Sequence, residues 1–339
     1  MLLTDILWGE PSHLWRLTRQ MGITTVVALL DGGEQDQRMF ASVGKGSAAV
    51  GSGGDAPWGE PALRRLVDRF DEHGFDVSVI EDTPPLDLAR LGLPGRDEQI
   101  DNLITQVRAM GRVGIPTLCY NWMALSSWAR TSVVVPGRGG ALVTGYDERL
   151  AGELAPLAAD GELTPEQLWS GLEYMLDAVV PVAEESGVRL ALHPDDPPRG
   201  VVRGVPRIFG EVAAFERLME LAPSHANAIT LCQGNFALMT DDLPSTIAQF
   251  LRKDAVAFVH FRDVRGTAGS FVETFHDDGQ TDLVECMRVY AEHGYTGPVR
   301  ADHVPTMDGE SNRHPGYETL GRLYANGYIR GLINSAYRS

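Results

Sequence analysis

The sequence predicts a single (β/α)8 barrel (a TIM barrel) with loop insertions and a helical C-terminal tail. The first observation behind this prediction is that short apolar segments rich in β-branched residues alternate with longer segments of helical periodicity. The second is that several apolar segments end in a polar side chain where a loop begins, which is where such barrels place their active-site residues. The length of 339 residues suits one barrel domain over residues 1–339.

Eight strands are expected in this barrel. Residues 24–30 form the first, because β-branched side chains are frequent there and Asp31-Gly32-Gly33 ends the segment. Residues 189–193 form the fourth, and it must end there because the prolines that follow cannot continue a central strand. The other expected strands cover residues 76–81, 117–122, 228–232, 257–260, 271–275 and 298–302.

Helices are expected between these strands. Residues 61–73 place apolar side chains on one helical face, and Gly74 terminates the segment. Thr164-Pro165-Glu166-Gln167 combines a capping box with proline at the first helical position, so a helix begins there and runs towards Gly187, with a bend at Pro181. Further helices are expected over residues 97–110, 206–221 and 281–293, and over most of the tail at 317–336.

Two long connections interrupt this pattern. Residues 43–59 are rich in glycine but lack the spacing of a phosphate-binding loop, so we expect them to form a loop over the barrel mouth. Residues 136–161 also contain several glycines, and we expect them to form an insertion or lid within the barrel domain.

Composition restricts the partners and the compartment. The net charge of -17 argues against binding to nucleic acid or to an anionic membrane surface. Three cysteines without a CxxC pair indicate a reducing compartment, and the amino terminus lacks the basic and apolar regions of a signal peptide. We therefore expect a cytoplasmic protein that binds a small molecule. It could also form a homo-oligomer.

Four strand ends carry side chains that can bind a metal: His193, Cys232, His260 and Asp302. Each has a simpler explanation on its own, as a hydrogen-bonded core histidine, an inert cysteine or a capping aspartate. Their recurrence at one topological position favours a divalent-metal site at the mouth of the barrel. The residue types do not choose the metal, because imidazole and thiolate suit Zn or Fe while a carboxylate also suits Mn.

Several motifs between residues 117 and 317 together resemble those of one known family. They are Cys119-Tyr-Asn-Trp-Met123, Trp128-Ala-Arg130-Thr131, His193-Pro-Asp-Asp-Pro-Pro198, Val205-Pro-Arg-Ile208, Leu231-Cys232 with Gly234, Val259-His260-Phe-Arg262, Glu273 with His276, Gly279 and Asp282, Arg300 with Asp302-His303, and Pro315-Gly316-Tyr317. This set resembles the mannonate dehydratases, sugar-acid enzymes of the xylose-isomerase-like barrel group. The most specific of these motifs is His193-Pro-Asp-Asp-Pro-Pro198.

The resemblance implies roles for individual residues. The family's metal ligands correspond to the same four strand-end residues, and its acid/base pair corresponds to His303 and Tyr317. The implied metal is Mn2+, with Fe2+ as the alternative. The implied reaction is a metal-dependent dehydration of D-mannonate to 2-keto-3-deoxy-D-gluconate by a hydro-lyase. The residues expected to bind the substrate are Asn121, Arg207, Arg262 and His276.

The chain also departs from the family's motifs. The usual Cys-Thr-Gly-Ser is Cys232-Gln-Gly-Asn235 here, and the usual Asp-His-Gly is Asp302-His-Val304. Two alternative functions therefore stay open. One is a metal-dependent isomerase or epimerase of a related sugar or sugar acid. The other is a catalytically inactive barrel that binds a sugar acid, which retention of both His303 and Tyr317 disfavours.

Overall fold

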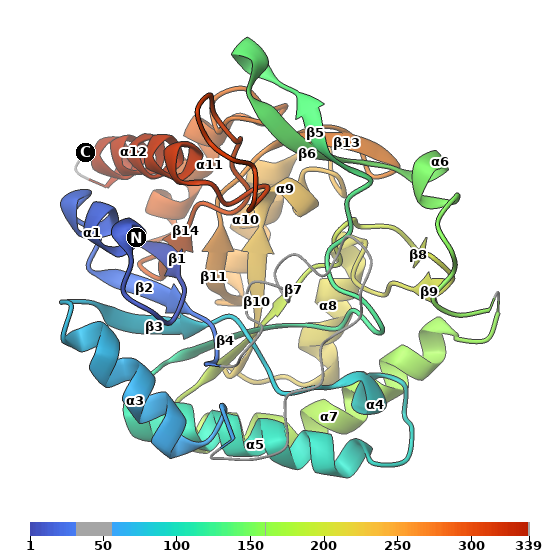
Figure 1. The fold of residues 1–339 in the computed structure, drawn as a ribbon. Helices are drawn as coiled ribbons and strands as arrows, with labels where there is room; N and C mark the ends of the chain where they lie inside the picture. Colours follow the sequence, from blue (N-terminus) through green and yellow to red (C-terminus); the bar gives the residue numbers. More distant parts are fainter. Residues whose placement is uncertain (32–55, 160, 338–339) are drawn as a thin grey trace.

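The computed structural model describes residues 1–31, 56–159 and 161–337, and in them the chain forms a closed barrel of parallel strands. Most of the loop expected at residues 43–59 lies outside the described residues. The strands surround the centre of the molecule in Figure 1, with helices around them. Around the barrel the order is β1 (Leu2–Leu7), β14 (Pro298–Arg300), β11 (Val256–His260), β10 (Asn227–Cys232), β7 (Arg189–His193), β4 (Thr117–Asn121), β3 (Asp76–Ile80) and β2 (Thr25–Ala28). The predicted fold class is confirmed.

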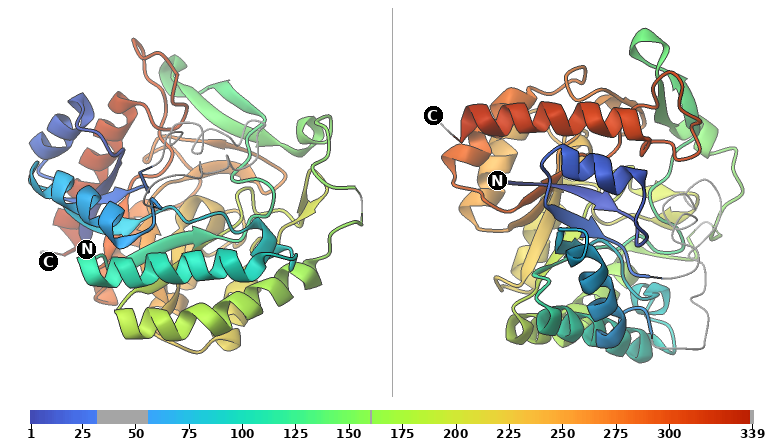
Figure 2. Two further views of the ribbon diagram at one scale, coloured as in Figure 1. Left: turned by 60° about the horizontal axis from the view of Figure 1, so that its bottom comes forward. Right: turned by 60° about the vertical axis from the view of Figure 1, so that its left-hand side comes forward.

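Two of the strand predictions need correction. The barrel begins with β1, which the sequence analysis did not identify, and residues 271–275 do not belong to the barrel. Asp5 gives β1 a polar centre, but its carboxylate is buried and accepts a hydrogen bond of 2.7 Å from Arg322 of α12 (Thr319–Ala336). The buried partner therefore comes from the far end of the chain, and α12 packs beside β1 (Figure 2).

The segment at 271–275 instead contributes β13 (Ser270–Glu273) to a separate antiparallel sheet. This sheet has the order β12 (Val264–Thr267), β13, β6 (Leu142–Asp147) and β5 (Ser132–Pro136). A two-residue turn joins β12 to β13, and such a hairpin can only be antiparallel. Periodicity identified β13 as a strand but could not say which sheet it joins.

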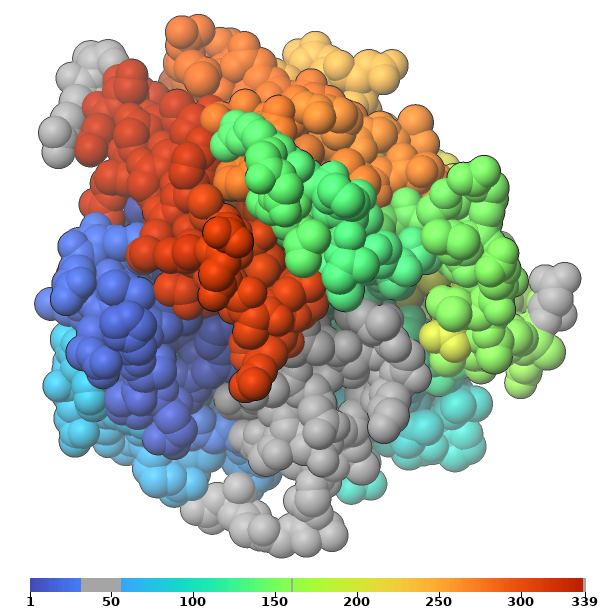
Figure 3. All heavy atoms as spheres, turned by 45° about the horizontal axis from the view of Figure 1, so that its top comes forward, coloured from blue at the N-terminus to red at the C-terminus, as the bar shows by residue number. Residues whose placement is uncertain are grey.

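The first part of residues 136–161 forms defined elements, and residues 152–159 are irregular. They include β6 and the short helix α6 (Glu148–Ala151). An isolated bridge pairs Leu142 with Thr306, and Arg138 forms an ion pair with Asp277, so this segment lies against the C-terminal third of the chain. In Figure 3 this segment, in green, lies against the orange and red segments of the C-terminal third.

The helices between the barrel strands follow the predicted alternation. The longest of these is α7 (Pro165–Ser186), which has the capping box at Thr164 and Gln167 and contains Pro181. The other helices are α1 (His13–Gln20), α3 (Glu60–Asp71), α4 (Asp87–Arg90), α5 (Arg96–Val113), α8 (Val212–Leu221), α9 (Gln233–Phe236), α10 (Leu243–Arg252) and α11 (Leu283–Glu292), with a 3-10 turn η2 at Arg138–Gly140. In the described part of the chain, no helix is both long enough and apolar enough to cross a membrane.

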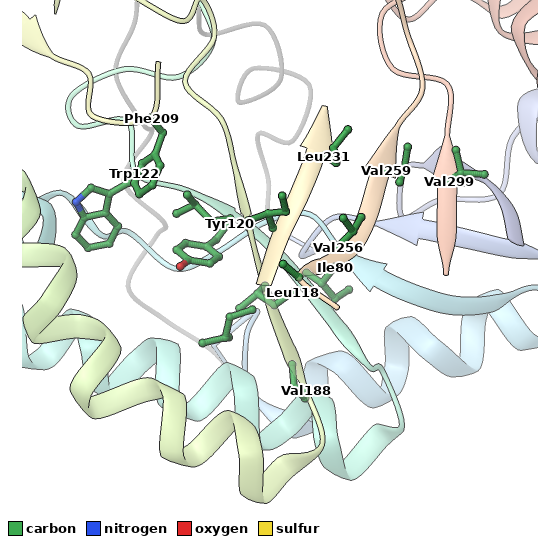
Figure 4. Packing of buried hydrophobic residues seen from close by; sticks show 14 of the residues in the cluster. Ile80, Leu118, Tyr120, Trp122, Val188, Phe209, Leu231, Val256, Val259 and Val299 are labelled. Carbon is green, nitrogen blue, oxygen red and sulfur yellow. The ribbon is translucent and has the colours of Figure 1, made fainter. Parts of the chain in front are cut away.

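Apolar side chains fill the space on both sides of the barrel wall. Those that point outward, such as Leu118, Leu231 and Val299, pack in the large cluster beneath the helices (Figure 4). A smaller inner cluster includes Ile6, Val79, Cys119, Phe258 and Tyr317. Each fully buried side chain of this size contributes about 1.5–3 kcal/mol relative to its exposed state. The inner cluster includes Tyr317, so the apolar interior reaches the residues discussed next.

Candidate metal centre and active site

The four predicted metal ligands meet at the carboxyl ends of neighbouring strands. His193, Cys232 and His260 are the last residues of β7, β10 and β11, and Asp302 lies two residues beyond β14. Cys232 and His260 are register partners across β10 and β11. One ligand atom from each of the four lies within 4.8 Å of the others. The parallel register of the barrel therefore brings together residues that are up to 109 positions apart in sequence.

The orientation of the two imidazoles fits a bound cation. His193 Nδ1 lies 2.7 Å from the carbonyl oxygen of Pro194 and donates to it, which leaves the lone pair on Nε2. That nitrogen is 3.2 Å from His260 Nδ1, which in turn is 3.5 Å from the Asp302 carboxylate. Cys232 Sγ lies 3.7 Å from the same carboxylate oxygen. Two nitrogens, one sulfur and one oxygen therefore face a common centre, a donor set that transition-metal ions accept.

The charges around this centre also favour a cation. Burial and Arg300 oppose protonation of His260, but the carboxylates of Glu81 and Asp302 outweigh them and raise its pKa to about 9. Burial would raise the pKa of Asp302, yet His303, Arg300 and His260 hold it well below its usual range. Without a metal, the site thus holds a proton on His260 at neutral pH. A metal ion would displace this proton, because only a neutral imidazole can be a ligand.

Glu81, one residue beyond β3, and Arg300, the last residue of β14, support the centre. Arg300 binds both carboxylate oxygens of Glu81 at 2.7 and 2.9 Å and reaches Asp302 Oδ1 at 2.9 Å. Glu81 Oε2 is 3.5 Å from His260 Nε2, the ring nitrogen that faces away from the other ligands. A second group that could hold a metal, Glu81 with Cys119 and His260, shares that histidine. The second group offers three donors and the first offers four, so the second is the poorer cation site.

His303 and Tyr317, the predicted acid/base pair, both lie beside Asp302. The Tyr317 hydroxyl donates to Asp302 Oδ1 at 3.3 Å, and His303 Nε2 is 3.9 Å from the same oxygen. The two rings meet edge to face with centroids 5.4 Å apart, and Trp128 packs on the imidazole at 4.6 Å. Burial and the Asp302 carboxylate raise the pKa of Tyr317 well above its usual range, so the phenol keeps its proton.

A buried network of two arginines and two carboxylates lies behind His303. Arg130 binds Asp196 at 2.6 and 2.9 Å and Glu273 at 2.5 Å, and Arg262 binds the same two carboxylates at 2.8–2.9 Å. All four side chains are at most 1% exposed. A side chain at Gly234 would place its Cβ 2.6 Å from Arg262, so the glycine of the Cys232 motif makes room for this guanidinium.

The four residues predicted to bind the substrate differ in their present contacts. Arg262 is engaged with Asp196, Glu273 and Asn235, and its Nε lies 2.7 Å from Asp302. Arg207 is buried and donates to Ser126 at 2.7 Å; its Nη1 lies 3.7 Å from the Asp195 carboxylate, and its Nε and Nη1 make no hydrogen bond to the described residues. Asn121, at the end of β4, accepts from the backbone of Met123. His276 is buried, which lowers its pKa to about 4 and keeps the ring neutral.

Sequence reasoning gave no role to several residues of this region. Glu81 ends an expected strand in the same way as the ligands do, so its position could have identified it. Arg130, Asp196 and Glu273 were recognised only as parts of motifs, because they come from three separate loops and sheets. No periodicity in the sequence indicates that a residue of β13 and residues of the loops after β4 and β7 share one buried network.

Comparison with known proteins gives a consistent result. The family model described as D-mannonate dehydratase (UxuA) matches residues 19–158 and 155–339. A mannonate dehydratase from Streptococcus agalactiae is 32% identical over 82% of this chain and 87% of its own length. Mannonate dehydratase 2 from Halalkalibacterium halodurans is 33% identical over 81% and 87%. The crystal structure of the mannonate dehydratase from Streptococcus suis serotype 2 superposes with a TM-score of 0.87, at 28% identity, over 100% of this chain and 95% of that one.

Proposed function

Since the chain belongs to the D-mannonate dehydratase family, we propose that its barrel-mouth residues carry out the family's reaction through a divalent metal. The enzyme is a hydro-lyase that removes water from D-mannonate and gives 2-keto-3-deoxy-D-gluconate. One observation supports the residue assignment above all others: His303 and Tyr317 both flank Asp302, which also faces the other three candidate ligands.

The metal would be held by His193, Cys232, His260 and Asp302. Mn2+ is the first candidate and Fe2+ the second, as the family resemblance implies; the mixed donor set of imidazole, carboxylate and thiolate does not by itself choose between them. Such a cation, when bound, acts as a Lewis acid that draws electron density from the oxygens of the sugar acid. Asp302 is held in place by Arg300 at Oδ1 and by Arg262 at Oδ2, so its carboxylate stays ionised and oriented.

Two protons must move in this dehydration. A base takes the proton from C2, a C2–C3 double bond forms as the C3–O bond breaks, and the leaving hydroxyl takes a proton to become water. The enol that remains converts to the 2-keto-3-deoxy acid. Tyr317 suits the acid, because its phenol keeps its proton in the buried site. His303 suits the base, because an imidazole accepts protons near neutral pH and this one lies beside Asp302.

Substrate capture needs positive charge in this acidic protein. Arg207 is only loosely paired, with Nη1 3.7 Å from Asp195, and its Nε and Nη1 make no hydrogen bond to the described residues, so we assign it the substrate carboxylate. Arg262 is saturated by carboxylates and Asn235, and it acts on the site by fixing Asp302. Asn121 and His276 remain candidates for contacts with the sugar hydroxyls. Their positions near the barrel mouth and the neutral state of His276 support this role.

Residues 136–161 are proposed as a lid within one barrel domain over residues 1–339. Their contacts with the C-terminal segment, through Leu142 and Arg138, support this role. A cytoplasmic location is proposed because all three cysteines are free and buried.

The function is tested by a screen of sugar acids with Mn2+ and Fe2+, read by an assay for α-keto acids. D-mannonate should be turned over with release of an α-keto acid, and the activity should disappear with a chelator and return with metal. Formation of an epimer without α-keto acid would instead identify a metal-dependent epimerase. Binding of D-mannonate without turnover would identify an inactive sugar-acid-binding barrel.

The residue roles are tested by Tyr317→Phe and His303→Asn. Each should keep the metal and the fold but lose turnover by roughly a hundredfold or more, the usual contribution of a general acid or base. Metal content is measured beside the rate. A fully metallated variant that runs within a few-fold of the parent would remove that residue from proton transfer.

A further inference from the structure

Glu273 lies directly behind the imidazole of His303. Its Oε1 is 2.9 Å from His303 Nδ1, and both side chains are buried. Burial would raise the pKa of Glu273, but Arg262, His303 and Arg130 outweigh it and lower that pKa to about 2. Glu273 is therefore a carboxylate at neutral pH and can only accept hydrogen bonds.

A second group also approaches His303 Nδ1, and its hydrogens decide the tautomer. Arg130 Nη2 lies 3.1 Å from this nitrogen, but it has only two hydrogens. One points to Asp196 Oδ2 at 2.9 Å and the other to Glu273 Oε1 at 2.5 Å. Nη2 thus shares two hydrogens among three contacts, of which the one to the imidazole is the longest. An ionised Glu273 has no hydrogen to donate, so its 2.9 Å contact favours a hydrogen on His303 Nδ1.

From this geometry we propose that Glu273 is a positioning residue that fixes the tautomer and the ring plane of His303. Nδ1 carries the hydrogen that Glu273 accepts, so Nε2 is the ring nitrogen left free to exchange a proton with the substrate. Nε2 is on the side of Asp302, at 3.9 Å from its Oδ1. The proton-accepting atom thus faces the candidate metal centre. This inference rests on the proposed function of His303.

The surroundings of the ring support such a fixed orientation. Trp128 packs on one side with ring centroids 4.6 Å apart, and Tyr317 meets the ring edge to face. Gly316 lies close as well, since a Cβ there would be 3.5 Å from His303 Cδ2. Rotation of the ring by half a turn about its Cβ–Cγ bond would place a carbon against the Glu273 carboxylate, which would leave that charge with one hydrogen bond fewer.

The direct test is ¹⁵N NMR of the enzyme labelled at histidine and loaded with diamagnetic Zn2+. The signals of His303 are identified by their absence in His303→Asn. We expect the hydrogen on Nδ1 in this loaded, folded enzyme. A neutral ring with the hydrogen on Nε2 would overturn the proposal. This result does not depend on turnover, so it stands apart from the failure of the proposed function, which would show as a parent enzyme inactive on D-mannonate.

Kinetics provide the second test. Glu273→Leu should lower kcat by at least roughly tenfold at unchanged metal content and nearly unchanged KM, as is usual when an outer-shell partner is lost. Glu273→Gln should restore most of kcat, because its amide oxygen can still accept from Nδ1. In the His303→Asn background, Glu273→Leu should cause no further loss, since it acts only through the imidazole. Additive losses in that double variant would show a structural role instead.

Asp196 offers the matched control. It binds the same two arginines but makes no hydrogen bond to His303. Asp196→Asn should therefore keep kcat within a few-fold of the parent. If Asp196→Asn lowered kcat as much as Glu273→Leu, the effect would belong to the arginines and the proposal would fail. If Glu273→Leu did not fold, the NMR measurement on the parent would still decide.

Discussion

Two buried polar clusters lie side by side at the barrel mouth, and they differ in whether they are complete without a ligand. In the network of Arg130, Arg262, Asp196 and Glu273, each charge meets an opposite charge within 3 Å. In the metal cluster of His193, Cys232, His260 and Asp302, four electron-pair donors face one another. The first cluster neutralises itself, while the second needs a proton or a cation between its members.

The difference indicates which cluster is framework and which is reactive. A self-neutral network gains nothing from a ligand, and it holds Asp302 and His303 in place through Arg262 and Glu273. The donor cluster changes its charge when a metal replaces the proton on His260. We therefore expect damage to the network to appear in stability and damage to the donor cluster to appear in metal binding.

The largest expected effect is on stability, from Arg262→Met. Removal of this side chain leaves Asp196, Glu273 and part of Asp302 as buried carboxylates with fewer positive partners. Breaking a buried ion pair from one side typically costs about 3–5 kcal/mol. The free energy of unfolding of the metal-free protein, from urea titration followed by circular dichroism, should fall by roughly this amount.

Arg265→Met is the control for this substitution. Arg265 pairs with Asp278 at 3.1 Å on the surface, with 57% of its side chain exposed. An exposed pair contributes less than about 1 kcal/mol. If Arg262→Met lowered the free energy of unfolding no more than Arg265→Met does, the buried network would not stabilise the fold, and the proposed difference between the two clusters would be wrong.

A smaller effect is expected from Cys232→Ser, and only when metal is present. A ligand at a hundred times its Kd stabilises the folded state by about 2.7 kcal/mol. The parent should gain this stability with Mn2+, and Cys232→Ser should gain much less, because a hydroxyl ionises less readily than a thiol. Thermal unfolding with and without Mn2+ measures the difference.

Cys119→Ser is the matched variant, on β4, which β7 separates from β10. Cys119 is buried too, but it belongs to the second group with Glu81 and His260. It should keep the metal-dependent gain. The opposite pattern, with the gain lost in Cys119→Ser and kept in Cys232→Ser, would place the metal in the second group.

The two clusters also differ in how far the sequence could predict them. The four metal ligands follow from one rule, since each lies at the end of an apolar strand or just beyond it, and parallel strands end on the same face. The same rule would have found Glu81. The network follows no such rule, because Glu273 lies on β13, which pairs with the non-barrel strands β12 and β6. Long-range pairing of an added sheet leaves no period in the sequence.

The fold shows the same limit at its first strand. Periodicity and turn residues identified seven barrel strands, but β1 contains Asp5, whose partner Arg322 comes 317 positions later. A buried charge resembles a loop residue until its partner is known. Local patterns therefore predicted the elements and the ligands, and contacts between distant segments decided which strand closes the barrel.

The smallest expected effect is on the pH dependence of the free energy of unfolding. It tests whether water is excluded from the barrel mouth beside the arginine–carboxylate network. Burial lowers the pKa of His276 from 6.5 to about 4, with Asp302, Glu273 and Arg262 among its charged neighbours. Between these two values the unfolded chain binds a proton that the folded chain does not, so this histidine stabilises the fold above pH 6.5, and the contribution is lost as pH falls towards 4. The loss is at most about 1.4 kcal/mol per pH unit.

The free energy of unfolding of the metal-free parent should therefore fall more steeply from pH 6.5 to 4.5 than that of His276→Asn. His225→Asn, at an exposed position, controls for removal of an imidazole. Equal slopes in the parent and in His276→Asn would show that water reaches His276, and the network would then be no more closed than the metal cluster.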